Sequence, residues 1–384
     1  MGGPQNTRGK KAGKWNGGSI SIRHLYFHIP FCAKLCPYCS FFVDTHFKNK
    51  SPRFLDALLN EVKQQSALHS LRPRTIYFGG GTPSSLSISE LESLARLRGL
   101  VDLSQLEEWT FEINPATVSA AKARTLRALG VNRISIGVQS WDDAILKTLG
   151  RNHTGAQAEQ TFHLLRDAGF ENINIDLMFA VPGQTREQWA RTLEKTASLR
   201  PEHISAYSLT YEEDTEFLRK LNAGEFVRDT EWDADLFEMT MDALAAAGYA
   251  QYEISNFALP GRESRHNFAY WLGEDYLGFG PSAFSTVGER RWQNIANTAA
   301  YAGGVLAGEP AISFEETVRP STRAGEIIAF SLRTNRGVPD ASLAPWQREV
   351  EEFRKLGFLQ SEGGQVMLTR KGKMMADSVA EIFV

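Results

Sequence analysis

All three cysteines of this 384-residue chain lie in one short run, Cys32-Ala-Lys-Leu-Cys36-Pro-Tyr-Cys39. Three thiolates on one loop can hold three irons of a cubane iron–sulfur cluster and leave the fourth iron open. A structural zinc site would need a fourth Cys or His nearby, and disulfide pairing would leave one thiol over. The remaining interpretation is three buried cysteines without a ligand. The flanking Pro30 and Pro37, at a change from strand to loop, favour a ligand-binding loop.

Composition limits the kind of protein that this loop serves. Hydrophobic residues make up 42% of the chain and charged residues 23%, with a net charge of −3, as in globular domains. This length predicts a main domain and a smaller one. The balanced charge argues against binding to nucleic acid or to an anionic membrane, and no apolar run approaches the roughly 18 residues of a membrane span. Residues 1–19 are Gly-rich and basic, which predicts a disordered tail and no secretory signal. Reduced thiols and an oxygen-labile cluster predict a cytoplasmic protein.

Between residues 20 and 210, strand-like and helix-like segments alternate six times. Each helix-like segment carries an apolar face or a start signal, such as Ser51 before Pro52 or the capping boxes Ser89-x-x-Glu92 and Thr185-x-x-Gln188. Such alternation predicts a parallel sheet with right-handed crossovers. Six units favour an open barrel, with functional residues on the loops after the strands. The predicted strands are 20–29, 75–78, 109–113, 133–138, 172–178 and 203–209.

The pattern changes after about residue 211. A long helix is predicted over 231–247, followed by an irregular aromatic and Gly-rich stretch over 249–291. From Gln347 the chain is predicted to form a helix, a hairpin turning at 362–364 and a last helix, which suggests a winged-helix-like unit. The last helix mixes acidic residues with its lysines and so lacks the basic face that DNA phosphates require. A packing or interaction role is therefore predicted for this unit.

These patterns together predict an α/β protein. Its main part is a partial (β/α)6 TIM-like barrel, and a C-terminal α+β domain follows. The predicted division of the chain is a tail over 1–19, the barrel over 20–228 and the C-terminal domain over 229–384.

The cysteine loop carries a resemblance to a known superfamily. Cys-x-x-x-Cys-x-x-Cys is the signature of radical S-adenosylmethionine (SAM) proteins, and the segment from Tyr26 to Cys32, Tyr-Phe-His-Ile-Pro-Phe-Cys, resembles their HemN/HemW branch. The resemblance implies a 4Fe–4S cluster held by Cys32, Cys36 and Cys39, and an electron donor for it. It implies that SAM chelates the open iron and can be cleaved to a 5′-deoxyadenosyl radical, while the protein supplies position and shelter. It also implies the same partial barrel.

A Gly run supplies a second motif one βα unit after the cysteines. Gly79-Gly80-Gly81-Thr82 follows a predicted strand, where glycine lets the backbone approach a ligand and its N–H groups face an anion. A Gly run alone would indicate only a tight turn. The resemblance implies that Gly80, Gly81 and Thr82 hold the methionine end of SAM.

Four polar residues follow strand ends and match positions that line the SAM pocket in the family. A carboxylate suits the ammonium and ribose hydroxyls of SAM, and a guanidinium suits its carboxylate. Each residue alone would be read as a helix cap or a surface ion pair. The four residues are Glu112, Gln139, Arg151 and Asp176. By the same resemblance Tyr26 and Tyr38 pack near SAM; otherwise they belong to the barrel core.

The chain differs from the oxygen-independent coproporphyrinogen dehydrogenases of this branch. Their motif continues to a further cysteine, where this chain has Phe41, and they carry a longer segment before the first strand. The run His266-Asn-Phe-Ala-Tyr270-Trp271 instead resembles the His-Asn-x-x-Tyr-Trp motif of the HemW heme chaperones. His266 is a candidate heme ligand, or else it belongs to a structural His-Asn turn before a core strand.

Three functions stay open at this point. The first is a heme chaperone that binds heme and transfers it to an acceptor protein, including a membrane-associated one. The second is a radical SAM enzyme of the coproporphyrinogen dehydrogenase type, against which Phe41 and the short tail weigh. The third is an iron–sulfur regulator that binds DNA, which the charge balance and the terminal helix disfavour.

Overall fold

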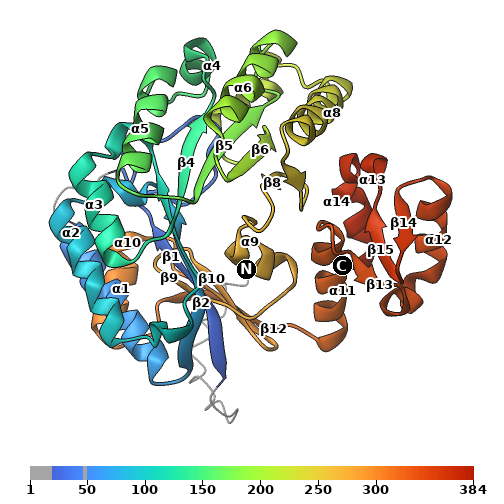
Figure 1. Cartoon of the computed structure of the whole chain (residues 1–384). Coiled ribbons are helices and arrows are strands. Elements are labelled where there is room, and N and C mark those ends of the chain that lie inside the picture. The colour runs from blue at the N-terminus through green and yellow to red at the C-terminus, as the bar shows by residue number, and fades with distance from the viewer. Residues whose placement is uncertain (1–19, 46–49) are drawn as a thin grey trace, which may run out of the picture.

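The computed structural model describes residues 20–45 and 50–384. The tail predicted over 1–19 lies outside the described residues. Figure 1 shows helices on the outer side of a curved sheet, with a smaller unit of helices and short strands toward the carboxyl terminus.

Six parallel strands form the body of the sheet in the order β6-β5-β4-β3-β2-β1. They are β1 (Ser21–Ile29), β2 (Ser70–Gly80), β3 (Glu108–Ile113), β4 (Arg133–Gln139), β5 (Ile173–Phe179) and β6 (His203–Ser208). The helices that connect or follow them are α1 (Ser51–Ser66), α2 (Ile88–Ser93), α3 (Ala120–Leu129), α4 (Asp143–Thr148), α5 (Gly155–Asp167), α6 (Arg186–Leu199) and α7 (Glu216–Asn222). The predicted alternation is confirmed in all six units.

The first residues of the helices show which capping signals in the sequence predicted a helix start correctly. The capping box at Thr185 and Gln188 is confirmed. The box predicted at Ser89 and Glu92 is wrong, because Ser87 and Glu90 form it, with the Ser87 N–H donating to the Glu90 carboxylate over 2.7 Å. The S-x-x-E pattern occurs twice in overlap there, and the earlier copy precedes the first helical residue. Ser51 is itself the first residue of α1, after Lys50.

The sheet extends beyond the six predicted strands to nine. Strand β9 (Leu277–Phe279) pairs with β1 in parallel, and β8 (Asn256–Ala258) pairs with β6 antiparallel. Strand β7 (Ala250–Gln251) pairs with β8. Helix α8 (Thr230–Ala246) packs against α6, where the Trp189 indole donates to the Thr240 hydroxyl over 2.9 Å. The boundary predicted at 228/229 therefore falls between strands of one sheet.

The segment after β9 adds a second sheet and stays attached to the barrel. Strands β10 (Phe284–Val287), β11 (Arg290–Asn294) and β12 (Ile312–Thr317) form an antiparallel sheet. Helix α10 (Thr298–Leu306) lies on α1, where the Asn60 and Gln64 amides each donate to the Val305 carbonyl over 3.1 Å. These elements share the hydrophobic core of the barrel. We therefore propose that the first unit continues through β12.

The carboxyl-terminal unit has its own core, which runs from Ile328 to Phe383. A three-stranded sheet in the order β13-β15-β14 lies among its helices. Its elements are α11 (Pro320–Leu332), β13 (Val338–Pro339), α12 (Gln347–Lys355), β14 (Leu359–Glu362), β15 (Gln365–Leu368), α13 (Arg370–Met374) and α14 (Ala376–Ala380). The predicted order of helix, hairpin and helix is confirmed, and the winged-helix comparison stays a prediction.

The two faces of the barrel strands differ in polarity, because side chains alternate along a strand. On β4, Ile134, Ile136 and Val138 are fully buried beneath the helices. The inward positions are mostly polar. They include His24, Thr75, Glu108, Thr110, Glu112, Arg133, Ser135, Asn174, Asp176, His203 and Ser205. Helix α9 (Arg265–Trp271) lies at the open side of this curved sheet (Figure 1).

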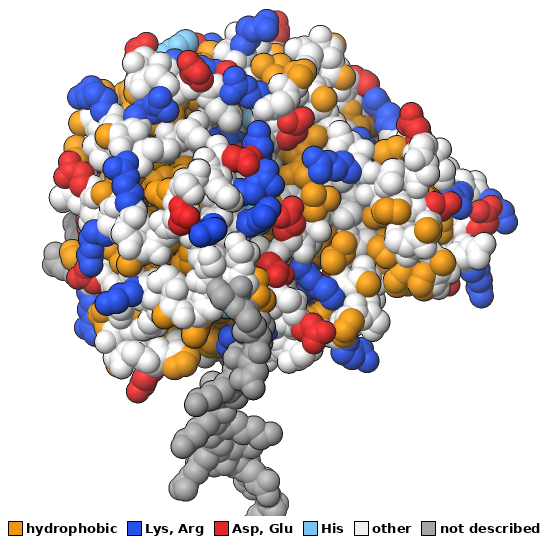
Figure 2. Space-filling view, turned by 60° about the horizontal axis from the view of Figure 1, so that its bottom comes forward, with side chains coloured by type: hydrophobic (Ala, Val, Ile, Leu, Met, Phe, Trp, Pro, Cys, Tyr) orange, Lys and Arg blue, Asp and Glu red, His pale blue; other side chains and the backbone are white. Residues whose placement is uncertain are grey.

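The face at the bottom of Figure 1 is turned forward in Figure 2. Lys and Arg side chains gather near the middle of that face, with Asp and Glu among them. Among the described residues, Glu107 at the start of β3 pairs with Arg74 over 2.8 Å and also with Arg265. Among the described residues no helix is both long and apolar enough to cross a membrane.

A buried carboxylate joins α1 to the segment after β9. Glu61 accepts hydrogen bonds from the Gly280 N–H, the Asn294 amide and the Tyr301 hydroxyl, over 2.9, 2.7 and 2.6 Å. Burial raises the pKa of Glu61 from 4.5 to about 7, against the lowering effect of these donors. Between pH 4.5 and about 7, the Glu61 carboxyl group is therefore protonated in the folded state and ionised in the unfolded state.

We predict that this carboxyl group makes the protein less stable as pH rises from 4.5 to about 7, by about 3 kcal/mol in total. A group whose pKa is raised on folding contributes its full stabilisation at pH values below its pKa in the unfolded state. This stabilisation is lost as the pH rises through the pKa in the folded state. The variant Glu61→Gln should remove this slope in urea unfolding measured across the window. The matched control is Glu92→Gln on exposed α2. Equal slopes in Glu61→Gln and wild type would contradict the prediction.

Candidate functional site

A cavity of about 470 Å³ lies at the carboxyl ends of the barrel strands. It is lined by the three cysteines and by eight of the other predicted site residues. These eight are Tyr38, Gly80, Gly81, Thr82, Glu112, Gln139, Arg151 and Asp176. Tyr26 and His266 do not line it.

The three cysteines are free thiols that share this cavity. The Cys32 sulfur lies 3.3 Å from the Thr82 hydroxyl, and an Arg151 N–H approaches the Cys36 sulfur at 3.8 Å. Burial raises the pKa of Cys32, and it raises the pKa of Cys39 to about 11. Metal binding must therefore release protons from these thiols. Within residues 20–45 and 50–384, no three His, Cys, Asp or Glu side chains stand ready-made around one metal position.

The Gly run packs directly against the strand that delivers the cysteines. The Gly81 N–H donates to the Ile29 carbonyl and the Thr82 N–H to the Phe31 carbonyl, each over 2.8 Å. A Cβ on Gly81 would lie 2.7 Å from the carbonyl carbon of Pro30. Gly80 has a φ of +105°, and a Cβ there would meet the His28 ring at 2.5 Å. Only glycine fits both positions, so the run fixes the distance between β2 and the cysteine loop.

Two half-buried carboxylates, Glu112 and Asp176, face the cavity from β3 and β5. Burial raises the pKa of Glu112 to about 7, although the Tyr77 hydroxyl donates to it over 2.7 Å. Burial also raises the pKa of Asp176, which accepts from the Ser135 hydroxyl over 3.0 Å and from the Asn174 amide over 2.7 Å. These hydrogen bonds fix the positions of both carboxylates at the cavity wall.

Arg151 and Gln139 belong to the β4 side of the cavity. Arg151 donates to the Gly137 carbonyl over 2.7 Å, and its Nε is buried without a partner. Its positive charge lies beside the Cys36 sulfur. Gln139 ends β4 with a φ of 67°, a left-handed conformation that costs energy outside glycine. Such strain is common where a strand ends at a binding site.

The two predicted tyrosines differ in position. Tyr38 lines the cavity and packs on Phe217, with 6.1 Å between ring centres. Tyr26 stacks on Tyr77 behind the cavity wall, also at 6.1 Å, and its hydroxyl lies 3.1 Å from His28 Nδ1. Tyr26 thus supports the wall in this structure and does not face the cavity.

The sequence analysis missed several lining residues, among them Tyr77, Ser135, Met178 and Tyr207. The signal that could have found them is the period of two along a strand. Ser135 and Asp176 stand on neighbouring strands, and Met178 lies two residues beyond Asp176 on the same face. Ser135 also pairs directly with Glu112, a predicted site residue on the neighbouring strand.

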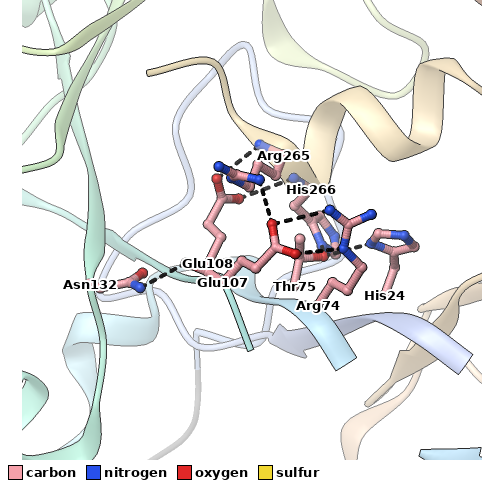
Figure 3. A network of polar contacts seen from close by, with 8 residues as sticks. All are labelled: His24, Arg74, Thr75, Glu107, Glu108, Asn132, Arg265 and His266. Carbon is pink, nitrogen blue, oxygen red and sulfur yellow. Dashed lines mark hydrogen bonds and ion pairs between the residues drawn. The ribbon is translucent and has the colours of Figure 1, made fainter. Parts of the chain in front are cut away.

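His266 lies away from the cavity, inside the barrel. It lies in the first turn of the helix α9, so the prediction of a core strand directly after it is wrong. Its side chain is 2% exposed, its Nδ1 lies 2.7 Å from the Thr75 hydroxyl, and its ring stacks on Tyr77. The Glu108 carboxylate accepts from the Arg265 and His266 N–H groups over 2.8 and 3.1 Å (Figure 3). The start of α9 is therefore fastened to β2 and β3.

Comparison with known proteins agrees with this geometry. The family model described as Radical SAM superfamily matches residues 26–196, which hold the cysteine loop and the cavity. The chain is similar over 95% of its length to the solved structure of coproporphyrinogen III oxidase (HemN) from Escherichia coli, with a TM-score of 0.81 and 24% identity, and it covers 90% of that chain. The barrel therefore has the radical SAM fold.

Similar proteins of known name identify the family within the radical SAM superfamily. The heme chaperone HemW of Lactococcus lactis is 36% identical, with 94% of this chain and 96% of the relative covered. The HemW proteins of Bacillus subtilis and Escherichia coli are 34% and 32% identical, each with 94% of this chain and at least 97% of the relative covered. The chain therefore belongs to the HemW family of the radical SAM superfamily. The resemblance drawn from the cysteine loop and the His266 motif is confirmed.

We predict that Gly81→Ala disrupts the cysteine loop, because the new Cβ would collide with the Pro30 backbone. Anaerobically reconstituted protein should lose most of its bound iron and its SAM binding, measured by iron analysis and calorimetry. Gly99→Ala is the matched control, since nothing lies within 4 Å of a Cβ there. Full cluster content and unchanged SAM affinity in Gly81→Ala would show that the close approach is not required.

Proposed function

We propose that this protein is a heme chaperone, which binds heme and transfers it to an acceptor protein. The observation that carries the proposal is similarity along nearly the whole chain to relatives named heme chaperone HemW. Phe41 supports it. This side chain is 67% exposed at the cavity rim, where the dehydrogenases would carry their further cysteine.

We propose that Cys32, Cys36 and Cys39 hold the 4Fe–4S cluster and that SAM binds in the cavity beside it. The residues suit these groups, because three free thiols and the Arg151 guanidinium share one cavity with two carboxylates. When bound, the cluster supplies an electron that can cleave SAM. The chain itself supplies the fixed Gly81 turn, the half-buried carboxylates for the cationic part of SAM, and a positive charge beside Cys36.

The heme site, the acceptor and the electron donor also belong to this proposal. His266 is the proposed iron ligand, since imidazole is a common axial ligand. Its ring is enclosed in the conformation described, so ligation requires a path to Nε2 to open beside the ring. The acceptor includes membrane-associated clients, and a separate reductant serves the cluster. We place the protein in the cytoplasm, because its thiols must stay reduced.

A radical SAM decarboxylase is the second candidate, and the HemN-like fold favours it. Such an enzyme must enclose a radical and a large substrate together, away from water. Phe41 leaves the cavity rim without the further cysteine of that enzyme class. One assay separates the two candidates. Reconstituted protein is incubated anaerobically with SAM, reductant and coproporphyrinogen III, and formation of the divinyl product would reject the chaperone proposal in favour of the enzyme.

We predict that titration of purified protein with hemin gives a saturable Soret band. His266→Ala should shift this band and weaken hemin binding about tenfold or more, while the iron–sulfur content stays that of wild type. His163→Ala is the matched control, because that histidine is 60% exposed on α5. A Soret band that is identical in His266→Ala and wild type would place the iron ligand elsewhere.

We predict that SAM affinity falls as pH drops through 7, because Glu112, with its pKa raised to about 7, loses its charge there. A ligand that needs the carboxylate should bind about tenfold more weakly at pH 6 than at pH 8. Glu112→Gln should bind SAM weakly and with a flat pH profile, measured by calorimetry. A wild-type profile without this slope would remove Glu112 from contact with the cationic part of SAM.

A further inference from the structure

We infer that Glu274, His24 and Thr75 are positioning residues for His266. They hold its imidazole as the Nδ1–H tautomer, so that Nε2 stays an unprotonated acceptor inside the barrel.

Four side chains from distant parts of the sequence form one line of hydrogen bonds. His24 Nε2 lies 2.9 Å from a Glu274 carboxylate oxygen, and His24 Nδ1 lies 2.8 Å from the Thr75 hydroxyl. The same hydroxyl lies 2.7 Å from His266 Nδ1. Figure 3 shows His24, Thr75 and His266 next to one another beneath the start of α9. The line runs from a carboxylate that is 42% exposed to a histidine that is 2% exposed.

The direction of this line follows from the carboxylate at its outer end. An ionised carboxylate only accepts hydrogen bonds, so His24 must donate to Glu274 from a protonated Nε2. A neutral His24 then has a lone pair on Nδ1, and the Thr75 hydroxyl donates to it. That hydroxyl has a single proton, so toward His266 it can only accept. His266 must therefore carry its proton on Nδ1.

The opposite direction is unfavourable at its outer end. If Thr75 donated to His266, a neutral His24 would direct an unprotonated Nε2 at the Glu274 oxygen, with two acceptors 2.9 Å apart. Only a doubly protonated His24 would avoid this. Such a ring would place a positive charge on a side chain that is only 4% exposed, which burial disfavours.

The result is a buried lone pair without a partner. Among the described residues, His266 Nε2 is buried and has no hydrogen-bond partner. Leaving a buried polar atom unpaired is unfavourable, so the position suits a ligand that accepts the lone pair. Metal-binding histidines in proteins commonly donate their other ring N–H in this way, which fixes the tautomer and raises ligand basicity.

The class of ligand follows from the tautomer. An unprotonated Nε2 binds a Lewis acid or a hydrogen-bond donor, and it rejects a hydrogen-bond acceptor. That this ligand is heme iron rests on the proposed function, whereas the tautomer does not. The ligand reaches Nε2 while the Thr75 contact at Nδ1 is kept.

The first test needs no heme. The chain has eight histidines, and ¹⁵N labelling of histidine alone lets two-bond ¹⁵N–¹H correlation spectra report which nitrogen of each ring is protonated. His266→Gln assigns the signal. In wild type we expect His266 to be protonated on Nδ1 only. Thr75→Val should convert it to a mixture that includes the Nε2–H tautomer, whereas Thr75→Ser should keep the wild-type pattern.

A second variant is needed in case Thr75→Val, which changes a buried residue, prevents folding. Glu274→Leu changes the exposed end of the line and leaves Thr75 in place, and it too should give a mixture of tautomers. Glu263→Leu is its matched control. Glu263 and Glu274 line one cavity beside His24 and Thr75, but Glu263 takes no part in the line of hydrogen bonds. The inference is overturned if wild-type His266 is protonated on Nε2, or if neither Thr75→Val nor Glu274→Leu alters its tautomer.

Hemin titration separates this inference from the proposed function. If the lone pair binds heme iron, Thr75→Val should shift the Soret band and lower hemin affinity about tenfold to a hundredfold, with Thr75→Ser near wild type. Wild-type protein without a saturable Soret band would reject the heme proposal while the tautomer result stands. Hemin binding that is the same in wild type and Thr75→Val would overturn the assignment of heme iron to Nε2 and leave the chaperone proposal intact.

Discussion

Burial of polar side chains inside a parallel barrel is the constraint on which the rest of this structure depends. The outer faces of the strands are apolar and pack beneath helices, so the sheet could form with an ordinary core. The inner faces instead carry carboxylates, histidines and hydroxyls, each of which must find a partner because an unpaired buried polar atom is costly. Asp176 is held by Ser135 and Asn174, and Glu112 by Tyr77. The interior is thereby kept rigid and also ready for polar ligands.

Local sequence signals predicted the part of the fold that local physics determines. The six βα units follow from hydrophobic period, glycine stops and helix caps, because each of these acts over a few neighbouring residues. The cavity residues Gly80, Gly81, Glu112 and Asp176 could be found because parallel strands all end at the same rim of the barrel. Where two capping patterns overlapped at Ser87 and Ser89, the sequence alone did not decide between them.

Long-range contacts could not be predicted in the same way. Strands β7, β8 and β9 have two or three residues each, too few for a periodic pattern. The strands that β8 and β9 pair with in the barrel, β6 and β1, lie far away in the chain. For that reason the sequence did not predict that one sheet extends across 228/229. His266 and Thr75 are separated by 191 positions, and nothing in either motif predicts their contact. The fixed tautomer of His266 is visible only once the sheet has brought β1, β2 and α9 together.

The pairing of β9 with β1 has a consequence for synthesis of the protein. Tyr26 on the strand that carries the cysteine loop pairs with Gly278, so one edge of that strand stays open until most of the chain has left the ribosome. At about 5–20 residues per second, this delay is on the order of tens of seconds. Throughout it, one edge of β1 has no partner strand next to the loop that carries the three thiols. The sheet on both sides of this strand is therefore complete only when translation is nearly finished.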